Sequence, residues 1–379
     1  MMRIFECVVL CASLAVVGAT ILRAGAKKPL VLAEDTYFFA GGRYVKAADG
    51  EIMTGQMYVH AMVPAQVTQR YPIVMIHGMG QSGSNFEGTP DGREGWAQDF
   101  VRGGYAVYVV DQPARGRSAH HPDQDGPTAR NIFGNAAGMV RRFTAPENFN
   151  DYPQAKLHTQ WPGKGPGKGQ PGDPVFDQFF ATQVEALPTA SGKPELLMKE
   201  AGAALLDRIG PAILLTHSQS GAFGWQIADA RPKLVKGILA VEPSTKPVVN
   251  ADGTTTPPYG ISTMPITYAP AVTDSGQLSR RLQDAPDSPD LLRCWAQADP
   301  VRHLPNLQGI PIAIVLAQAS LFAQDGHCLS RYLTQAGVAN ELVRLEDVGI
   351  TGNGHMLMLE KNSDQIAAFL ASWLKRKGL

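Results

Sequence analysis

The sequence lacks an excess of charge of either sign. Its 379 residues include 34 Lys and Arg and 34 Asp and Glu, and no long run of one sign occurs. It therefore has no basic stripe for nucleic acid or an anionic membrane surface, and no self-similarity at the periods of about 20–50 residues that mark repeat proteins. We expect neither nucleic acid nor a charged lipid surface as a partner.

Cysteine is also scarce. Of the four cysteines, Cys7 and Cys11 fall in an apolar N-terminal stretch, which leaves Cys294 and Cys328 in the rest of the chain. Two cysteines in an exported protein have a single intramolecular pairing, so we predict one disulfide between them. The alternative is two unpaired, buried thiols. No C-x-x-C motif or Cys/His cluster indicates a metal site, and no cofactor is expected.

The N-terminus has the features of a targeting segment. Arg3 supplies a positive charge, residues 8–22 are almost wholly apolar, and Ala24-Gly25-Ala26 offers a small-x-small cleavage site, with 17–19 as a second one. This pattern predicts a signal peptide over residues 1–26 and a periplasmic or secreted protein. Glu6 is unusual in such a segment. An uncleaved anchor is the alternative, and only then would the chain associate with a membrane.

What the sequence does contain is an alternation of strand-like and helix-like runs. Apolar residues make up 44% of the chain, and 39 Gly and 28 Pro indicate many loops on a rigid scaffold. The alternation predicts an α/β fold, a mostly parallel eight-stranded sheet with helices on both faces, formed by residues 27–379. The expected strands are 37–45, 56–63, 72–77, 105–110, 212–215, 235–241, 311–316 and 341–345; the expected helices are 96–102, 195–209, 221–230, 328–335 and 363–375.

Two irregular stretches, at about 120–195 and 245–308, interrupt the alternation. The first contains a Gly- and Pro-rich run at 161–172 that fails as a phosphate-binding loop, because Lys168 is followed by Gly169 and no strand precedes it. The second is expected to contain a short helix near 288–298. We predict that both insertions lie over the carboxyl ends of the strands, and that 152–188 and 249–305 build the substrate pockets. Four aromatics are candidates for pocket or, more simply, core positions: Phe176, Phe179, Phe180 and Trp225.

The segment 213–224 carries the central motif. An apolar strand runs directly into a helix through Thr-His-Ser-Gln-Ser-Gly, with Ser218 at the junction and the small residues Thr216 and Ser220 two positions away on either side. This is the pattern of a nucleophile elbow, although both glycines of the usual G-x-S-x-G are replaced. An ordinary strand-to-helix turn with a capping serine is the alternative. Ser220 is a rival nucleophile.

A nucleophilic serine needs a base, and His355 is the candidate. It follows the last strand, in the Gly-rich loop of the segment Val348–Glu360, and precedes the terminal helix. A loop histidine there could reach the elbow, but it could also be a solvated loop residue. The rival base is His327, which follows the preceding strand and is expected to cap a helix.

An oxyanion hole is predicted after the strand at 72–77. The sequence His77-Gly-Met-Gly80 lets the backbone turn its N–H groups inward, and a second N–H comes from the residue after the nucleophile. We assign the two donors to Met79 and Gln219. His77 itself is expected to be structural.

Together these three motifs, in this order, resemble the α/β-hydrolase superfamily over about residues 37–376. The resemblance implies a triad acid, which in most members follows the seventh strand; here only Asp325 lies in that loop. The chain is also similar to a group of bacterial secreted esterases that use a glutamate after strand six. Glu242 lies at the tip of that strand, so we expect Glu242 as the acid and keep Asp325 as the alternative.

The expected activity is that of a serine carboxylesterase acting on small or aromatic esters through an acyl-enzyme on Ser218. Lactone or amide hydrolysis would use the same triad. A haloalkane dehalogenase would have Asp in place of Ser218. A non-catalytic binding protein on this fold would be expected to lack a triad member. The partner is then a small-molecule ester, and the sequence leaves open whether the chain forms a homodimer.

Overall fold

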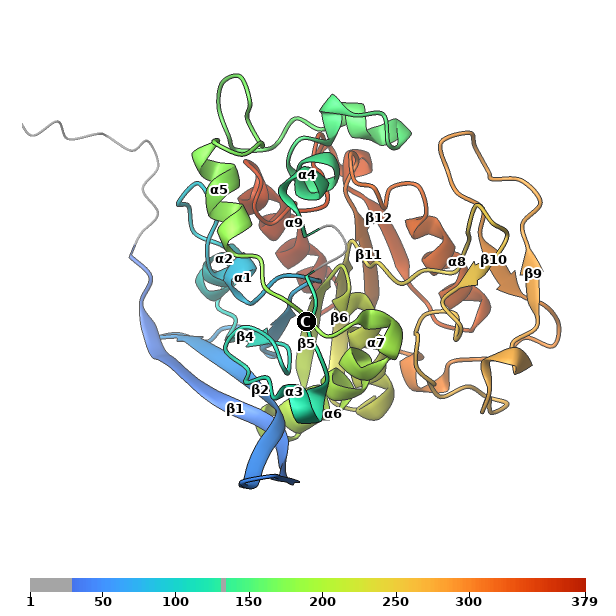
Figure 1. Cartoon of the computed structure of the whole chain (residues 1–379), viewed down its shortest axis with the longest axis horizontal. Helices are drawn as coiled ribbons and strands as arrows, with labels where there is room; N and C mark the ends of the chain where they lie inside the picture. Colours follow the sequence, from blue (N-terminus) through green and yellow to red (C-terminus); the bar gives the residue numbers. More distant parts are fainter. Residues whose placement is uncertain (1–28, 131–133) are drawn as a thin grey trace, which may run out of the picture. The chain divides into compact units, whose positions relative to one another are not determined.

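An eight-stranded sheet forms the centre of the computed structural model, which describes residues 29–130 and 134–379 (Figure 1). The strand order is β1-β2-β4-β3-β5-β6-β11-β12. The predicted signal peptide lies outside the described residues. The bounds of the strands are β1 Leu32–Ala47, β2 Gly50–Pro64, β3 Ile73–Ile76, β4 Val107–Asp111, β5 Ala212–His217, β6 Val235–Val241, β11 Ile312–Leu316 and β12 Glu341–Arg344.

The first two strands form an antiparallel hairpin, and all strands from β4 onward along the sheet run parallel to one another. Every residue of β3, β5 and β11 is buried. Such continuous apolar runs are typical of parallel strands covered on both faces. The carboxyl ends of β3, β5 and β6 consequently lie side by side, and the segments that follow them carry the site.

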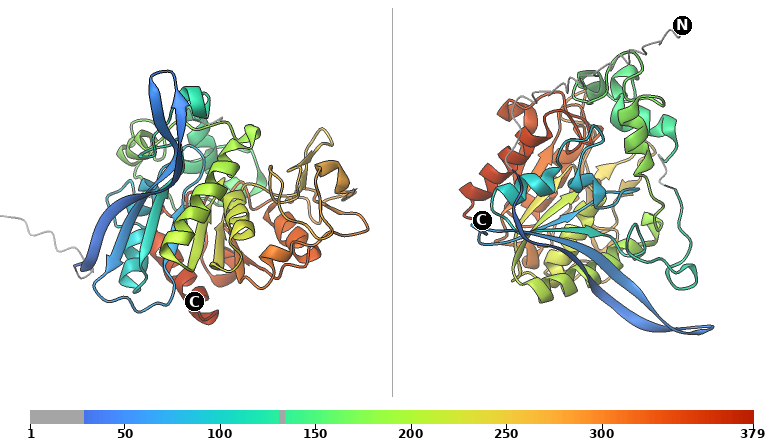
Figure 2. Two further views of the ribbon diagram at one scale, coloured as in Figure 1. Left: turned by 90° about the horizontal axis from the view of Figure 1, so that it is seen from below. Right: turned by 90° about the vertical axis from the view of Figure 1, so that its left-hand side faces the viewer.

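Helices cover both faces of the sheet. Figure 2 shows α6 (Lys193–Ile209) and α7 (Ser220–Ala230) on one face, with α2 (Trp96–Arg102) and α9 (Ser363–Arg376) on the other. Helix α8 (Gly326–Gln335) packs its buried Leu329, Tyr332 and Leu333 into the same core cluster as α6 and α7. This arrangement confirms the predicted α/β-hydrolase architecture. None of the described helices is long and apolar enough to span a bilayer.

Both insertions contain little regular structure. The described part of the first has the short α-helices α3 (Pro122–Asp125), α4 (Ala136–Met139) and α5 (Pro174–Ala181), with short π and 3₁₀ segments between and after them, and the run at 161–172 is a loop with turns. The second has two small hairpins, β7 (Val248–Val249) with β8 (Thr255–Thr256) and β9 (Arg280–Leu282) with β10 (Trp295–Gln297). In Figure 1 α4 and α5 of the first insertion lie at the top of the view and α3 lies beside α6 near the bottom, while the second insertion lies around α8.

The prediction of a short helix near 288–298 is wrong, because Trp295–Gln297 form the strand β10. Trp295 and Gln297 are buried while Ala296 between them is half-buried, an alternation that belongs to a strand. Trp295 pairs with Leu282 across the hairpin and packs edge-on against Tyr332 of α8, with the ring centroids 5.2 Å apart. These contacts with distant residues override the local propensity of the segment.

Candidate active site

The turn between β5 and α7 holds Ser218 in the left-handed region, with φ of 56°. Backbone bonds fix it there: Ser218 N–H donates to Val241 O (3.1 Å), and Ser218 O accepts from the N–H groups of Gly221 (3.0 Å) and Ser244 (3.0 Å). The surrounding backbone is close. A Cβ on Gly78 would lie 3.0 Å from the Ser218 Cβ, and one on Gly221 would lie 2.7 Å from the Pro243 Cβ. Such a strained, crowded turn is the geometry of a nucleophile elbow.

Ser220, the rival nucleophile, is bound within the turn. Its hydroxyl donates to Ile76 O (2.6 Å) and accepts from His217 N–H (2.7 Å), and its side chain is fully buried. It thereby ties β3 to β5 below the elbow. Nor does it cap α7, since the N-cap position is Gln219.

His355 lies against Glu242. The distance from His355 Nδ1 to Glu242 Oε2 is 2.9 Å, and both side chains are buried. Glu242 also accepts hydrogen bonds from Ala317 N–H (2.6 Å, at Oε1) and from the Ser320 hydroxyl. With Nδ1–H donating to the carboxylate, the lone pair of His355 Nε2 is available as a base. No hydrogen bond joins Ser218 to His355 in the part of the chain that the structure describes, but both residues line the same pocket.

Three aromatic side chains surround the His355 ring. Phe143, from the first insertion, stacks on it with centroids 5.2 Å apart, and Phe322 meets it edge-on at 4.8 Å. His217 lies at 4.7 Å, and its Nε2–H donates to His355 O (2.9 Å). His217, which precedes Ser218, therefore holds the backbone of His355.

Burial works against charge on both members of the His355–Glu242 pair. It lowers the pKa of His355 to about 3, with a further contribution from the Lys246 cation. It raises the pKa of Glu242 to about 8, against the hydrogen bonds from Ser320 and Ala317 and the charge of Lys246, which lower it. The imidazole is therefore uncharged at neutral pH.

Asp325, the alternative acid, has another partner. Its Oδ1 lies 2.9 Å from Lys246 Nζ, and both groups are buried. Lys246 Nζ also lies over the Phe322 ring, 3.2 Å from its centroid. The carboxylate after strand β11 is thus engaged by a lysine, while the one after β6 contacts His355.

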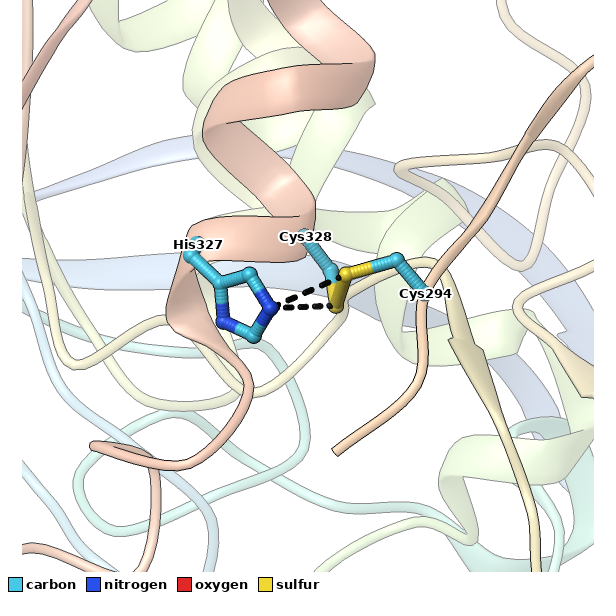
Figure 3. A group of neighbouring side chains, drawn as sticks. All are labelled: Cys294, His327 and Cys328. Carbon is cyan, nitrogen blue, oxygen red and sulfur yellow. Dashed lines mark hydrogen bonds between the residues drawn. A yellow bond between two sulfur atoms is a disulfide. The ribbon is translucent and has the colours of Figure 1, made fainter. Parts of the chain in front are cut away.

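The structure joins Cys294 and Cys328 by a disulfide, as the sequence predicted (Figure 3). His327, the rival base, points at this bond: its Nε2 lies 3.2 Å from Cys294 Sγ and 3.7 Å from Cys328 Sγ. Within the described residues, the potential ligand atoms of Cys294, His327 and Cys328 lie within 4.8 Å of one another, close enough to be compared with a metal site. Because both sulfurs are in the disulfide, the cluster offers no thiolates to a metal.

Two backbone amides in the loops around Ser218 have no hydrogen-bond acceptor among the described residues. Within the described residues, neither Met79 N–H nor Gln219 N–H donates to a carbonyl or side chain, and both residues line the pocket together with Ser218. Arg115, which is buried, bridges the two loops by donating to Gly78 O (3.0 Å) and to Gln219 Oε1 (3.2 Å). Met79 and Gln219 are the two residues from which the sequence predicts the oxyanion donors.

His77 is buried beneath the glycine loop, as expected. Its Nδ1–H donates to Gly78 O (2.9 Å), and its Nε2 accepts from Gln112 N–H (3.2 Å). Burial, with the Arg115 charge, lowers the pKa of His77 to about 3, so that it stays neutral.

The pocket over Ser218 is small, about 70 Å³, whereas sites for drug-sized ligands measure roughly 300–1,000 Å³. Its lining residues come mainly from the loops after the central strands: Gly78, Met79, Gln81, Phe143, His217, Ser218, Gln219, Ser244, Leu321, Phe322, His355 and Met356. The prediction that 152–188 and 249–305 line it is wrong, since Phe143 alone comes from an insertion. Residues 249–305 pack on α8 instead, and Phe176, Phe179 and Trp225 are buried core residues.

Sequence reasoning missed the residues that hold the base. His217 and Glu360 both lie inside the motifs that identified Ser218 and His355, yet their roles depend on contacts made across the fold. Ser320 and Lys246 carry no motif at all. Spacing along the chain offers no signal for such partners.

Comparison with known proteins shows the family of the chain. Residues 73–369 match the model of the alpha/beta hydrolase family. A probable secreted lipase, phiG, from a fungal species is 42% identical over 345 residues, which cover 90% of each chain. A solved structure of a novel bacterial esterase superposes with a TM-score of 0.59 at 24% identity, over 94% of this chain and 99% of that one, which shows a shared fold. The chain belongs to the alpha/beta hydrolase family.

Proposed function

We propose that this protein is a serine carboxylesterase that hydrolyses small or aromatic carboxylic esters, with Ser218 as nucleophile, His355 as base and Glu242 as the acid of the triad. The observation that carries this proposal is the pocket in which Ser218 and His355 meet, with His355 Nδ1 at 2.9 Å from Glu242. The fungal relative that is named a lipase supports ester hydrolysis as the reaction class.

The reaction follows from the placement of the groups. His355 Nε2 takes the Ser218 hydroxyl proton as the oxygen attacks the ester carbonyl carbon, and the amides of Met79 and Gln219 stabilise the negative carbonyl oxygen. The tetrahedral intermediate collapses to an acyl-enzyme when the alkoxide leaves with the proton from His355. Water then attacks the acyl carbon, losing a proton to His355. The second tetrahedral intermediate collapses as the bond to Ser218 Oγ breaks, and His355 returns the proton to that oxygen while the carboxylic acid is released.

The size of the pocket supports short or flat acyl groups. At about 70 Å³, the pocket is several times smaller than a typical drug-sized site. Its apolar side chains, Phe143, Leu321, Phe322 and Met356, suit an alkyl or aryl group rather than a charged one. A long fatty-acyl chain would have to extend beyond it.

The test combines an active-site probe with a substrate survey. Wild-type protein is expected to react with a fluorophosphonate probe and to lose that labelling in Ser218→Ala, while Ser220→Ala keeps it, because Ser220 is bonded within the turn. Among p-nitrophenyl esters, kcat/KM should be highest for short acyl chains and fall steeply beyond about eight carbons. Labelling that persists in Ser218→Ala would refute the nucleophile.

The same survey separates the other activities. A preference for lactones or amides over aryl esters would move the substrate class without changing the triad. A folded wild-type protein that neither labels nor turns over any of these compounds would indicate a binding protein.

We also propose that residues 1–26 are a signal peptide and that the protein is exported. The disulfide between Cys294 and Cys328 and the secreted fungal relative support this. N-terminal sequencing of the protein recovered outside the cytoplasm is expected to begin near Lys27. An intact Met1 in that material would instead indicate an anchor.

A further inference from the structure

A second buried histidine–carboxylate cluster lies outside the triad. His158, in the first insertion, contacts Glu147 through Nδ1 (2.7 Å to Oε2) and Glu360 through Nε2 (2.7 Å to Oε1). The side chains of His158 and Glu360 are fully buried, and that of Glu147 is 18% exposed. Both ring nitrogens face carboxylate oxygens, which accept, so both are placed to donate. We call Glu147, His158 and Glu360 the His158 clamp.

The charges around His158 favour the imidazolium. Burial by itself lowers the pKa of His158, but the hydrogen bonds and charges of Glu147 and Glu360 outweigh it and raise the pKa to about 9. Other charged or titratable groups adjoin the clamp. Lys168 Nζ lies 3.4 Å from Glu147 Oε1, and the Arg93 guanidinium donates to Glu360 O (2.9 Å). Glu242 and the Tyr152 hydroxyl lie close enough to interact electrostatically with Glu360. At neutral pH the clamp is therefore a buried cation held between two anions.

The far side of the clamp reaches the loop of the base. Glu360 accepts hydrogen bonds from Gly354 N–H (3.0 Å, at Oε1) and from the Asn353 side-chain amide (2.7 Å, at Oε2). Asn353 and Gly354 directly precede His355. One carboxylate thus connects the His158 cation to the backbone that carries the proposed base.

The two segments also pack closely along their length. Thr159 N–H donates to Gly352 O (2.9 Å), and the Gln160 side chain donates to Thr351 O (3.1 Å). A Cβ on Gly352 would lie 2.0 Å from Thr159 Oγ1, and one on Gly354 would lie 3.1 Å from His158 Cδ2. Segment 158–160 therefore lies flush against the loop 351–354.

We propose that His158 is a positioning residue, which as an imidazolium between Glu147 and Glu360 fixes the loop 351–354 and so holds His355 in place for catalysis. This inference rests on the proposed function. It assigns the first insertion a role in aligning the base, in addition to the pocket wall contributed by Phe143. A displacement of about 1 Å in a catalytic group costs on the order of 100-fold in rate, so a loosened loop should lower kcat.

The proposal gives a pH dependence with a definite sign. Because the folded-state pKa of His158 is raised to about 9 above an unfolded value near 6.5, the stabilisation is fully present below about pH 6.5 and is lost as pH rises through about 9. The kcat of the wild type should therefore fall on the alkaline side with an apparent pKa near 9. The titration of the His355–Glu242 pair is common to the wild type and to the variants compared, so the difference between their profiles reports on His158.

The experiment measures kcat and KM from pH 5 to 10.5 by pH-stat titration of the acid released from a small alkyl ester, which is stable to alkali on this time scale. In His158→Gln, kcat should fall about 10- to 100-fold, with a smaller change in KM, and the alkaline decline should vanish. In Glu147→Gln, the decline should move to lower pH, because one of the two anions that stabilise the imidazolium is gone. His303→Gln, at an exposed histidine of the other insertion, is the matched control and should keep the wild-type profile.

The outcomes separate this inference from the proposed function. Far-ultraviolet circular dichroism at each pH establishes that the proteins stay folded, and if His158→Gln does not fold, Glu147→Gln carries the test, since Glu147 is the partly exposed member of the clamp. An unshifted alkaline decline in Glu147→Gln, or an unchanged decline in a folded His158→Gln, would overturn the positioning role. Neither result changes the expected loss of fluorophosphonate labelling in Ser218→Ala. Labelling that persists in Ser218→Ala would count against the proposed function and not against the positioning role of His158.

Discussion

At the scale of single residues, the position of two carboxylates decides the proposed triad. Glu242 lies at 2.9 Å from His355 Nδ1, whereas Asp325 lies at 2.9 Å from Lys246 Nζ. Glu242 therefore contacts the proposed base, and Asp325 contacts a buried cation. Substitution of Glu242 should therefore lower mainly kcat, and substitution of Asp325 should lower mainly the free energy of unfolding.

Replacing Glu242 with Gln should lower kcat by roughly 10²–10⁴-fold, as equivalent changes do in other triads. The amide keeps the shape of the side chain but cannot stabilise the imidazolium that forms when His355 accepts the serine proton. Steady-state kinetics with one aryl ester, at a pH where the wild type is fully active, measure the loss. KM should change much less than kcat.

Asp325→Asn is the matched comparison. It should change kcat by less than about tenfold but lower the free energy of unfolding by about 3 kcal/mol, because it leaves the buried Lys246 cation without its counter-charge. Urea denaturation of both variants provides the stability values. If Asp325→Asn abolished turnover while Glu242→Gln retained it, the acid would have to be assigned to the loop after β11.

At the scale of elements, the junction of β5 and α7 carries backbone strain. Ser218 has a φ of 56°, a conformation that costs a non-glycine residue about 1–2 kcal/mol. The turn has little space to relax, because Gly78 lies against it on one side and Pro243, just after β6, lies against it on the other. The strain is therefore retained in the folded protein.

Ser218→Gly should be more stable than Ser218→Ala by roughly 0.5–1 kcal/mol, although both lack the proposed nucleophile. Glycine adopts positive φ without steric cost, and this gain exceeds its greater loss of backbone entropy on folding. Urea unfolding of the two variants side by side gives the difference. An alanine variant as stable as the glycine variant would show that the turn is not strained at this residue.

At the scale of the whole molecule, the disulfide ties the second insertion to α8. It links residues 34 apart in the sequence, Cys294 beside β10 and Cys328 in α8. Neither residue lines the pocket over Ser218. Its contribution should therefore appear in stability and not in catalysis.

The double variant Cys294→Ser, Cys328→Ser should lose about 2–4 kcal/mol of unfolding free energy, because closing a loop of this length restricts the unfolded chain. The kcat at 25 °C should stay within about twofold of the wild type as long as the protein is folded. Guanidinium denaturation and ester turnover on the same preparation provide both numbers. A large loss of kcat in a fully folded variant would mean that the second insertion acts on the pocket.

The sequence by itself determined the elements whose residues are governed by their neighbours along the chain. The buried strands were predictable because each is a short apolar run ended by glycine or a polar residue; β6 spans Val235–Val241 as expected, and α9 differs from its expected range by one residue. The strand–Ser218–helix junction and the glycine loop at 78–80 were recognisable for the same reason, since their local geometry restricts which residues fit. The family followed from three such motifs in order.

Only the tertiary structure decided which distant groups meet. The choice between Glu242 and Asp325 depended on where His355 and Lys246 lie, and no local pattern encodes a contact across 113 residues. The His158 clamp joins residues 202 positions apart. Trp295–Gln297 form a strand instead of the end of a helix because they pair with β9 and pack on α8. No described residue of the second insertion lines the pocket over Ser218. Burial and opposite charge stabilise such contacts only after the chain has folded, so local sequence does not specify them.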